Sequence, residues 1–247
     1  MKRYYSYAGV NICIEGKDEW MYKDDKGLSS FRVDHLEDCD TFTFEVVDVL
    51  EKPQGRMIAH ESNIIEYKEN EIIECYIGPI SNGWENAYMC VKHMGKNHFV
   101  SITESSLGDF IPVHTVYEVL QSEKLMADSN AILMHASYIE YQGKAILFTA
   151  PSGTGKSTQA DLWEKLRGAR ILNGDRCAVQ LREDGFYVCG VPFAGSSNIC
   201  ENVTLPLKTI VCLSQAPQTT ITPIKGFMAF RSVYEGCGIL PWDKKHV

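Results

Sequence analysis

The stretch AILFTAPSGTGKSTQADLWEKL, residues 145–166, sets the expected fold of this chain. Its first six residues are almost continuously apolar, which is typical of a strand buried on both faces. A short loop with two glycines follows. The pattern over residues 157–168 then predicts a helix that ends at Gly168, a residue suited to the left-handed C-cap. This order of strand, glycine loop and helix is the framework of a phosphate-binding loop.

The loop matches the pattern G-x-x-x-x-G-K-[ST], except that Ala150 replaces the first glycine. A methyl group is harmless there if φ stays negative. Backbone N–H groups at the start of a helix bind phosphate, the lysine reaches the β and γ phosphates, and the hydroxyl after it binds Mg²⁺. The sequence therefore predicts ATP and Mg²⁺ as ligands, with a structural glycine turn as the alternative. The predicted nucleotide-binding residues are Ser152, Gly153, Thr154, Gly155, Lys156, Ser157 and Thr158.

Magnesium on a triphosphate needs a second protein anchor, usually a carboxylate at the end of a neighbouring strand. Asp175 closes the short strand predicted over residues 169–175 and is the natural candidate. Ser157 and Asp175 are therefore the predicted metal ligands. A turn or cap role is the alternative for Asp175.

Composition and charge exclude several classes of protein. Residues 1–130 hold 12 Lys and Arg against 23 Asp and Glu, a net −11, whereas residues 131–247 hold 12 against 9, a net +3. The acidic first part argues against a nucleic-acid partner. No apolar run reaches the roughly 18 residues of a membrane span, and the first residues lack a signal-peptide core. Nine cysteines without a C-x-x-C pair indicate reduced thiols. We expect a cytoplasmic protein without a membrane anchor.

Two regions follow one another along the chain. Residues 1–107 contain short β runs at 7–15, 41–50, 63–80, 87–93 and 98–105, with turn signals between them, and no catalytic motif. Residues 108–247 begin with an expected amphipathic helix that starts at Asp109, has Pro112 in its first turn and extends to Met126. Strands are expected at 131–141 and 145–150, a hairpin at 177–191 with its turn at Glu183-Asp184-Gly185, and a buried strand at 207–215.

The segments APSGTGKST, MHASYIEYQGKAILFTA, LNGDRCAV and LPLKTIVCLSQ carry a family resemblance. Across about residues 131–225 the chain resembles the HPr kinase/phosphorylase superfamily, whose P-loop core is related to phosphoenolpyruvate carboxykinase. The resemblance implies an α/β fold with a mixed sheet, preceded by the β-rich N-terminal region. It also implies catalytic roles for His135, which stands 21 residues before Lys156, and for Asp175.

The chain departs from that superfamily at the acidic strand. The family has two adjacent aspartates there, the first serving as catalytic base, whereas this chain has Gly174 and Asp175. The acceptor-protein signature is replaced by GVPFAGSSN, so the phosphocarrier HPr is not the expected acceptor. The chain also ends where further helix is expected, which indicates a shortened member. A histidine within an apolar strand is by default a core residue, but the family spacing favours a role for His135 in accepting the acceptor's proton.

The leading hypothesis is a Mg²⁺-ATP-dependent kinase that transfers the γ-phosphoryl group to a hydroxyl of a peptide, a protein or a small molecule. Gly174 favours a different class, a nucleotide-binding module without phosphotransfer that acts as a sensor or as a partner in a biosynthetic cluster. A nucleoside monophosphate kinase is a weaker alternative, because such enzymes carry the loop near the N-terminus and an arginine-rich lid after it. Whether the protein is a homo-oligomer stays open at this point.

Overall fold

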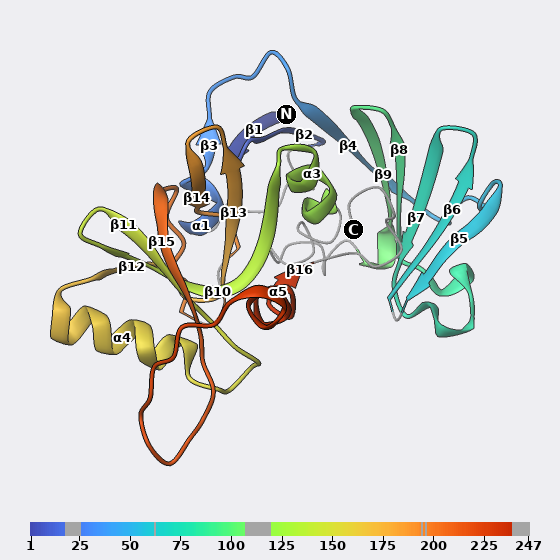
Figure 1. Cartoon of the computed structure of the whole chain (residues 1–247). Coiled ribbons are helices and arrows are strands. Elements are labelled where there is room, and N and C mark those ends of the chain that lie inside the picture. Colours follow the sequence, from blue (N-terminus) through green and yellow to red (C-terminus); the bar gives the residue numbers. More distant parts are fainter. Residues whose placement is uncertain (18–25, 62, 107–119, 194, 196, 239–247) are drawn as a thin grey trace.

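The computed structural model describes the chain except residues 18–25, 62, 107–119, 194, 196 and 239–247 (Figure 1). Its first part forms one nine-stranded sheet in the order β3-β1-β2-β4-β9-β8-β7-β6-β5. Neighbouring strands are antiparallel except for the parallel pairs β2–β4 and β4–β9. The strands are β1 (Lys2–Tyr7), β2 (Val10–Glu15), β3 (Arg32–Val33), β4 (Asp40–Val47), β5 (Arg56–Glu61), β6 (Ile64–Glu69), β7 (Ile72–Ile77), β8 (Met89–Met94) and β9 (Asn97–Thr103).

The second part forms a seven-stranded sheet around one long strand. Its strands are β10 (Ala131–Tyr141), β11 (Lys144–Thr149), β12 (Arg170–Asn173), β13 (Arg176–Arg182), β14 (Gly185–Cys189), β15 (Thr204–Cys212) and β16 (Cys237–Gly238). The first half of β10 pairs with β13, and its second half pairs with β11. Since β11, β15, β14 and β13 are also neighbours, the sheet closes on itself.

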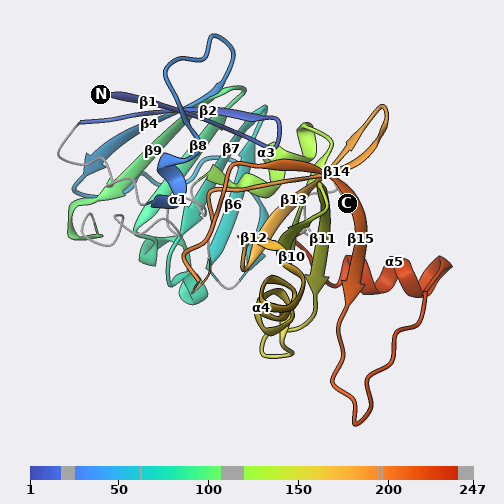
Figure 2. The same cartoon turned by 90° about the vertical axis from the view of Figure 1, so that its left-hand side faces the viewer.

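Short helices occupy the ends and faces of these sheets. They are α1 (Lys26–Ser29), α3 (Ser122–Asp128), α4 (Lys156–Arg167) and α5 (Gly226–Tyr234), with 3₁₀ turns at Ile80–Asn82 and Trp84–Asn86. Figures 1 and 2 show α4 beneath the β10, β11 and β12 segment and α3 between the two sheets. No helix in the described ranges is both long enough and apolar enough to cross a bilayer.

The expected α/β fold class is wrong. Strands make up 46% of the residues that the structure describes and helices 19%, and the sheets are large and mixed. Hairpins explain the difference, because a tight turn forces its two strands to be antiparallel. Gln142 and Gly143, both with positive φ, form such a turn between β10 and β11. The strand after α4, β12, pairs antiparallel with β10 and not in parallel with β11, so β11, α4 and β12 do not form a βαβ unit.

Several local expectations hold. β11 is buried throughout its apolar residues 145–149, and Gly168 ends α4 in the left-handed conformation, with its N–H donating to the Trp163 and Glu164 carbonyls. The hairpin of β13 and β14 turns at the expected residues. The expected buried strand at 207–215 instead spans Thr204–Cys212, and each of its residues is partly or fully exposed.

The helix expected from Asp109 to Met126 lies mostly outside the described residues. Within them, Leu120 is buried, and Gln121 has a φ of 43°, a left-handed conformation that interrupts an α-helix. The described helix α3 therefore starts only at Ser122.

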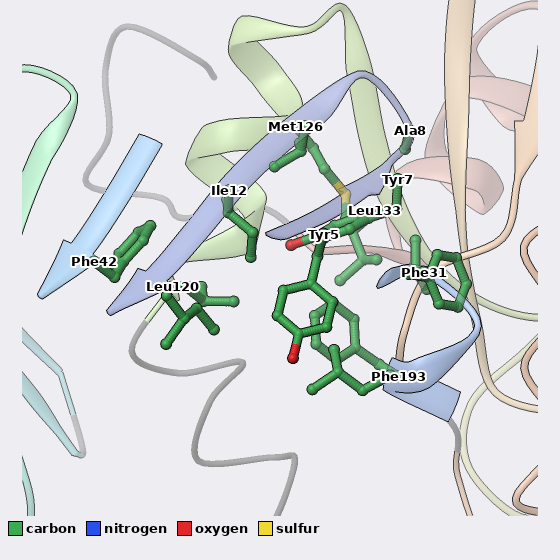
Figure 3. Close-up of a cluster of buried hydrophobic side chains, with 14 of the residues drawn as sticks. Tyr5, Tyr7, Ala8, Ile12, Phe31, Phe42, Leu120, Met126, Leu133 and Phe193 are labelled. Carbon is green, nitrogen blue, oxygen red and sulfur yellow. The ribbon is translucent and has the colours of Figure 1, made fainter. Parts of the chain in front are cut away.

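One buried cluster joins the two sheets (Figure 3). Tyr5, Ile12 and Phe42 come from the first sheet, while Leu133 and Phe193 come from the second part of the chain. The tyrosine Tyr7 makes edge-to-face contacts with Phe31 and Phe193, at ring-centroid distances of 6.1 and 6.0 Å. Smaller clusters lie inside the closed second sheet and under α4.

Candidate functional site

The loop between β11 and α4 is shaped by two glycines. Gly153 has a φ of 77° and Gly155 a φ of 115°. An added Cβ would meet nothing within 4 Å at Gly153 and only Thr158 at 4.0 Å from Gly155, so backbone conformation, not space, requires glycine. Gly155 is the N-cap of α4, and its carbonyl accepts the N–H of Gln159. Ala150 does not have a positive φ, so the missing first glycine does not distort the loop.

Lys156 is the first residue of α4, and its side chain turns back over the loop. The Nζ atom donates a hydrogen bond of 3.0 Å to the carbonyl oxygen of Ala150, and the residue is buried. The α-helix starts at Lys156 itself. The aliphatic part of the Lys156 side chain is therefore covered by the protein, while its ammonium group stays at the loop.

His135 lies where β10 exchanges one partner strand for another. His135 pairs with Arg176 of β13, and the next residue pairs with Thr149 of β11. Its backbone N–H donates to Gly236 at 2.7 Å, and its carbonyl accepts the Thr149 hydroxyl at 3.0 Å. The His135 side chain is 45% exposed. It is therefore not the core histidine that a position within an apolar strand suggests by default.

The imidazole of His135 contacts the carboxylate of Asp175. His135 Nε2 lies 2.7 Å from Asp175 Oδ1, and Asp175 Oδ2 lies 3.3 Å from the Nε of Arg176. The hydrogen bond from His135, helped by the nearby positive charges, lowers the pKa of Asp175, against the effect of burial. An ionised carboxylate only accepts, so Nε2 is the donor in this pair, and Nδ1 is left for a second contact.

A buried asparagine holds the turn that carries Asp175. The Asn173 Oδ1 atom accepts the backbone N–H groups of Asp175 and Arg176 at 2.8 and 3.0 Å, and its Nδ2 donates to the Phe193 carbonyl at 3.0 Å. The Gly174 carbonyl accepts the Ser137 hydroxyl at 3.0 Å. These bonds fix the carboxylate relative to β10.

The phosphate-type loop and the histidine–aspartate pair line one cavity of about 320 Å³. Of the residues predicted to bind nucleotide, all but Thr154 line it, and both His135 and Asp175 do so. The lining residues are His135, Ser152, Gly153, Gly155, Lys156, Ser157, Thr158, Gly174, Asp175, Gly195 and Ser197.

Gly195 and Ser197 are site residues that the sequence reasoning missed. A Cβ on Gly195 would lie 2.7 Å from the Cβ of Asp175, and a Cβ on Gly174 would lie 3.0 Å from the Cβ of Ser197 and closer still to its hydroxyl. Gly195 and Ser197 thus lie directly against the Gly174–Asp175 turn. The run of small residues GSS in GVPFAGSSN was the available signal, because only small side chains permit such close packing.

Ser157 and Asp175 form a donor set suited to Mg²⁺. Both offer oxygen, the carboxylate is ionised, and Mg²⁺ usually takes one or two protein ligands together with phosphate oxygens and water. Each carboxylate oxygen of Asp175 has two lone pairs, so its contacts with His135 and Arg176 leave room for a metal. Within the described ranges, no three His, Cys, Asp or Glu side chains group into a metal site built by protein alone.

The family comparison covers this site. Residues 102–237, more than half of the chain, match the family model described as SynChlorMet cassette protein ScmC. The match includes His135, the loop at 150–158, Asp175 and Ser197. No curated protein matches the chain.

Proposed function

The chain belongs to the ScmC family of SynChlorMet cassette proteins, and we propose that it is a Mg²⁺-ATP-dependent kinase acting on a hydroxyl group. One observation carries the proposal: a single cavity joins a glycine loop at a helix N-terminus to an exposed histidine held by an ionised aspartate. The first binds phosphate, and the second can take a proton. The resemblance of residues 131–225 to HPr kinase supports the same chemistry.

The chain's own residues have distinct parts in this proposal. Backbone N–H groups of Gly153 to Ser157 bind the β and γ phosphates, and Lys156 leaves the Ala150 carbonyl to contact them. Asp175 holds His135 with the proton on Nε2, so that Nδ1 accepts the proton of the attacking hydroxyl. Ser157 and Asp175 would hold Mg²⁺, which would neutralise phosphate charge when bound.

We propose an acceptor among the molecules handled by the same cassette, because the family description names a cassette. A peptide or protein serine and a small hydroxyl compound have the same reacting group. The cavity lined by residues 135, 152–153, 155–158, 174–175, 195 and 197 would receive that hydroxyl between the loop on one side and Gly195 and Ser197 on the other.

A nucleotide panel tests the phosphate site. Wild-type protein should gain about 2.7 kcal/mol of stability with ATP at 100 times its Kd, and Lys156→Ala should lose most of this gain. Lys165→Ala is the matched control, since it removes the same charge from the exposed last turn of α4. Equal stabilisation of all three proteins by ATP would refute phosphate binding by this loop.

The stabilisation of the protein by Mg²⁺ can be measured separately from its stabilisation by the nucleotide. Asp175→Asn should keep the stabilisation by ATP in EDTA and lose the increment that Mg²⁺ adds in the wild type. Titration of Mg²⁺ at fixed ATP measures this, and equal increments in both proteins would exclude Asp175 as a ligand.

A second candidate function is a nucleotide-binding module that transfers no phosphate. The absence of a second carboxylate at Gly174 favours it. Transfer from γ-labelled ATP to serine peptides and small hydroxyl compounds distinguishes the two: the kinase labels an acceptor, whereas the module binds ATP and labels none.

A further inference from the structure

The helix α5 exposes its largest apolar side chains. Phe227 is 75% exposed, Met228 60%, Phe230 62% and Tyr234 44%. Its side toward the body carries smaller residues: Ala229, Ser232 and Val233 are only partly exposed, and Val233 packs against the core of the second sheet. A helix that served only to cover the sheet would be expected to place its large apolar residues inward.

The exposed aromatic residues form a continuous row. Phe227 and Phe230 have ring centroids 6.4 Å apart, and those of Phe230 and Tyr234 are 5.5 Å apart. Figure 2 shows α5 at the edge of the molecule opposite the nine-stranded sheet. We call the four exposed side chains of the helix, Phe227, Met228, Phe230 and Tyr234, the α5 face.

The α5 face is large enough for a small protein interface. Taking roughly 200 Å² for a whole large side chain, the exposed fractions of its four side chains correspond to roughly 500 Å² on one chain. This lies within the roughly 300–600 Å² of the largest apolar patch on a typical monomer, a patch that is often functional. Two copies packed face to face would bury roughly 1,000 Å², the lower limit of a specific protein interface.

The charges on the helix permit contact with a second copy of the same helix. Arg231 lies on the exposed side, and its Nε is 2.9 Å from a carboxylate oxygen of Glu235 on the same helix. A two-fold interface places each surface against its own copy, so an unpaired charge at its centre would meet a like charge. Here the central charge already has its counter-ion.

We propose that the α5 face is the self-association surface of a two-fold dimer of this chain. With two α5 helices antiparallel across the axis, Phe230 meets its own counterpart and Phe227 meets Tyr234 of the other chain. The interface would lie next to the candidate site, because α5 leads to Gly236, whose carbonyl accepts the His135 N–H, and to β16, which pairs with β10. The proposal does not depend on the kinase assignment.

Sedimentation of the full chain tests the proposal. Wild-type protein should be a dimer within about 1 to 100 µM, the range expected for an interface of modest size. Phe230→Glu should weaken dimerisation by at least about 30-fold, the loss typical of a central aromatic residue. Phe186→Glu is the matched control: this residue is 56% exposed on the β13–β14 hairpin, away from the face, and its variant should dimerise normally.

A charge pair distinguishes self-association from other uses of the face. Phe230→Glu and Phe230→Lys should each be monomeric when alone and should form a mixed dimer when combined, because the two-fold axis brings residue 230 against itself. A wild-type chain that stays monomeric at every concentration from about 1 to 100 µM overturns the proposal. This holds even if its α5 face binds a peptide or lipid vesicles. A dimer that Phe230→Glu leaves intact overturns it as well.

Discussion

His135 gains its orientation from contacts with segments that lie beside its strand. Its backbone is held on both sides, by Gly236 and Thr149, and its ring is held by Asp175. The side chain is therefore fixed although it is 45% exposed. A residue placed in this way suits proton transfer more than core packing, and substitution separates the two roles.

We predict that His135→Asn binds Mg²⁺-ATP as the wild type does and loses phosphoryl transfer by roughly 10²–10⁴-fold, the usual contribution of a general base. Stability should change by no more than about 1 kcal/mol, because the ring is 45% exposed and an asparagine can keep one hydrogen bond. Labelled ATP and equilibrium unfolding measure the two quantities. His60→Asn, at an exposed position on β5, is the control. Wild-type transfer by the His135 variant would remove His135 from the mechanism.

Asp175 makes stability depend on pH in a defined direction. The His135 hydrogen bond lowers the pKa of Asp175 below its usual 3.8. The ionised carboxylate therefore contributes its full stability above pH 3.8. This contribution is lost as the pH falls through the lower pKa that Asp175 has in the folded state. We expect Asp175→Asn to be less stable than wild type by about 1 kcal/mol at pH 7. Urea unfolding at several pH values should show this difference shrinking in acid; a constant difference would contradict the ion-pair account.

Among the elements, the strand, loop and helix at residues 144–167 were predictable because their signals are local. The apolar run, the two glycines and the C-cap at Gly168 each act within a few residues. The pairing of β12 with β10 depends on contacts distant in sequence, which local patterns do not determine. The fold class was wrong for that reason. The sequence analysis did not find the side of the cavity lined by Gly195 and Ser197 for the same reason.

Close packing between two loops predicts a coupling between Gly174 and Ser197. A methyl group on Gly174 would collide with the Ser197 side chain. Gly174→Ala should therefore destabilise the protein by about 1–3 kcal/mol. In a Ser197→Gly background the same change should cost less than about 0.5 kcal/mol. A thermodynamic cycle from urea unfolding measures the coupling, and equal costs in both backgrounds would show that Ser197 moves away freely. A Gly174→Asp variant would meet the same collision and would need the same Ser197→Gly change to relieve it.

At the scale of the whole molecule, the two sheets share their largest core. Leu133 belongs to β10, yet it packs in the cluster that contains Tyr5, Ile12 and Phe42 of the first sheet (Figure 3). The division into residues 1–107 and 108–247, expected from the sequence, stays a prediction about folding units. A shared core makes it testable, because neither sheet can open there without exposing the residues of the other.

We predict that Leu133→Ala lowers the free energy of unfolding by about 3 kcal/mol, the cost of a cavity at a buried leucine, and that both sheets lose this stability together. Hydrogen exchange measures it segment by segment, comparing β1 and β2 with β10 and β13. Leu166→Ala, at a position on α4 that is 74% exposed, should change protection by less than about 0.5 kcal/mol. If Leu133→Ala lowered protection in β10 and β13 alone, the first sheet would fold independently. The boundary near residue 107 would then separate two folding units. Equal losses in both sheets would mean that the chain unfolds as one cooperative body.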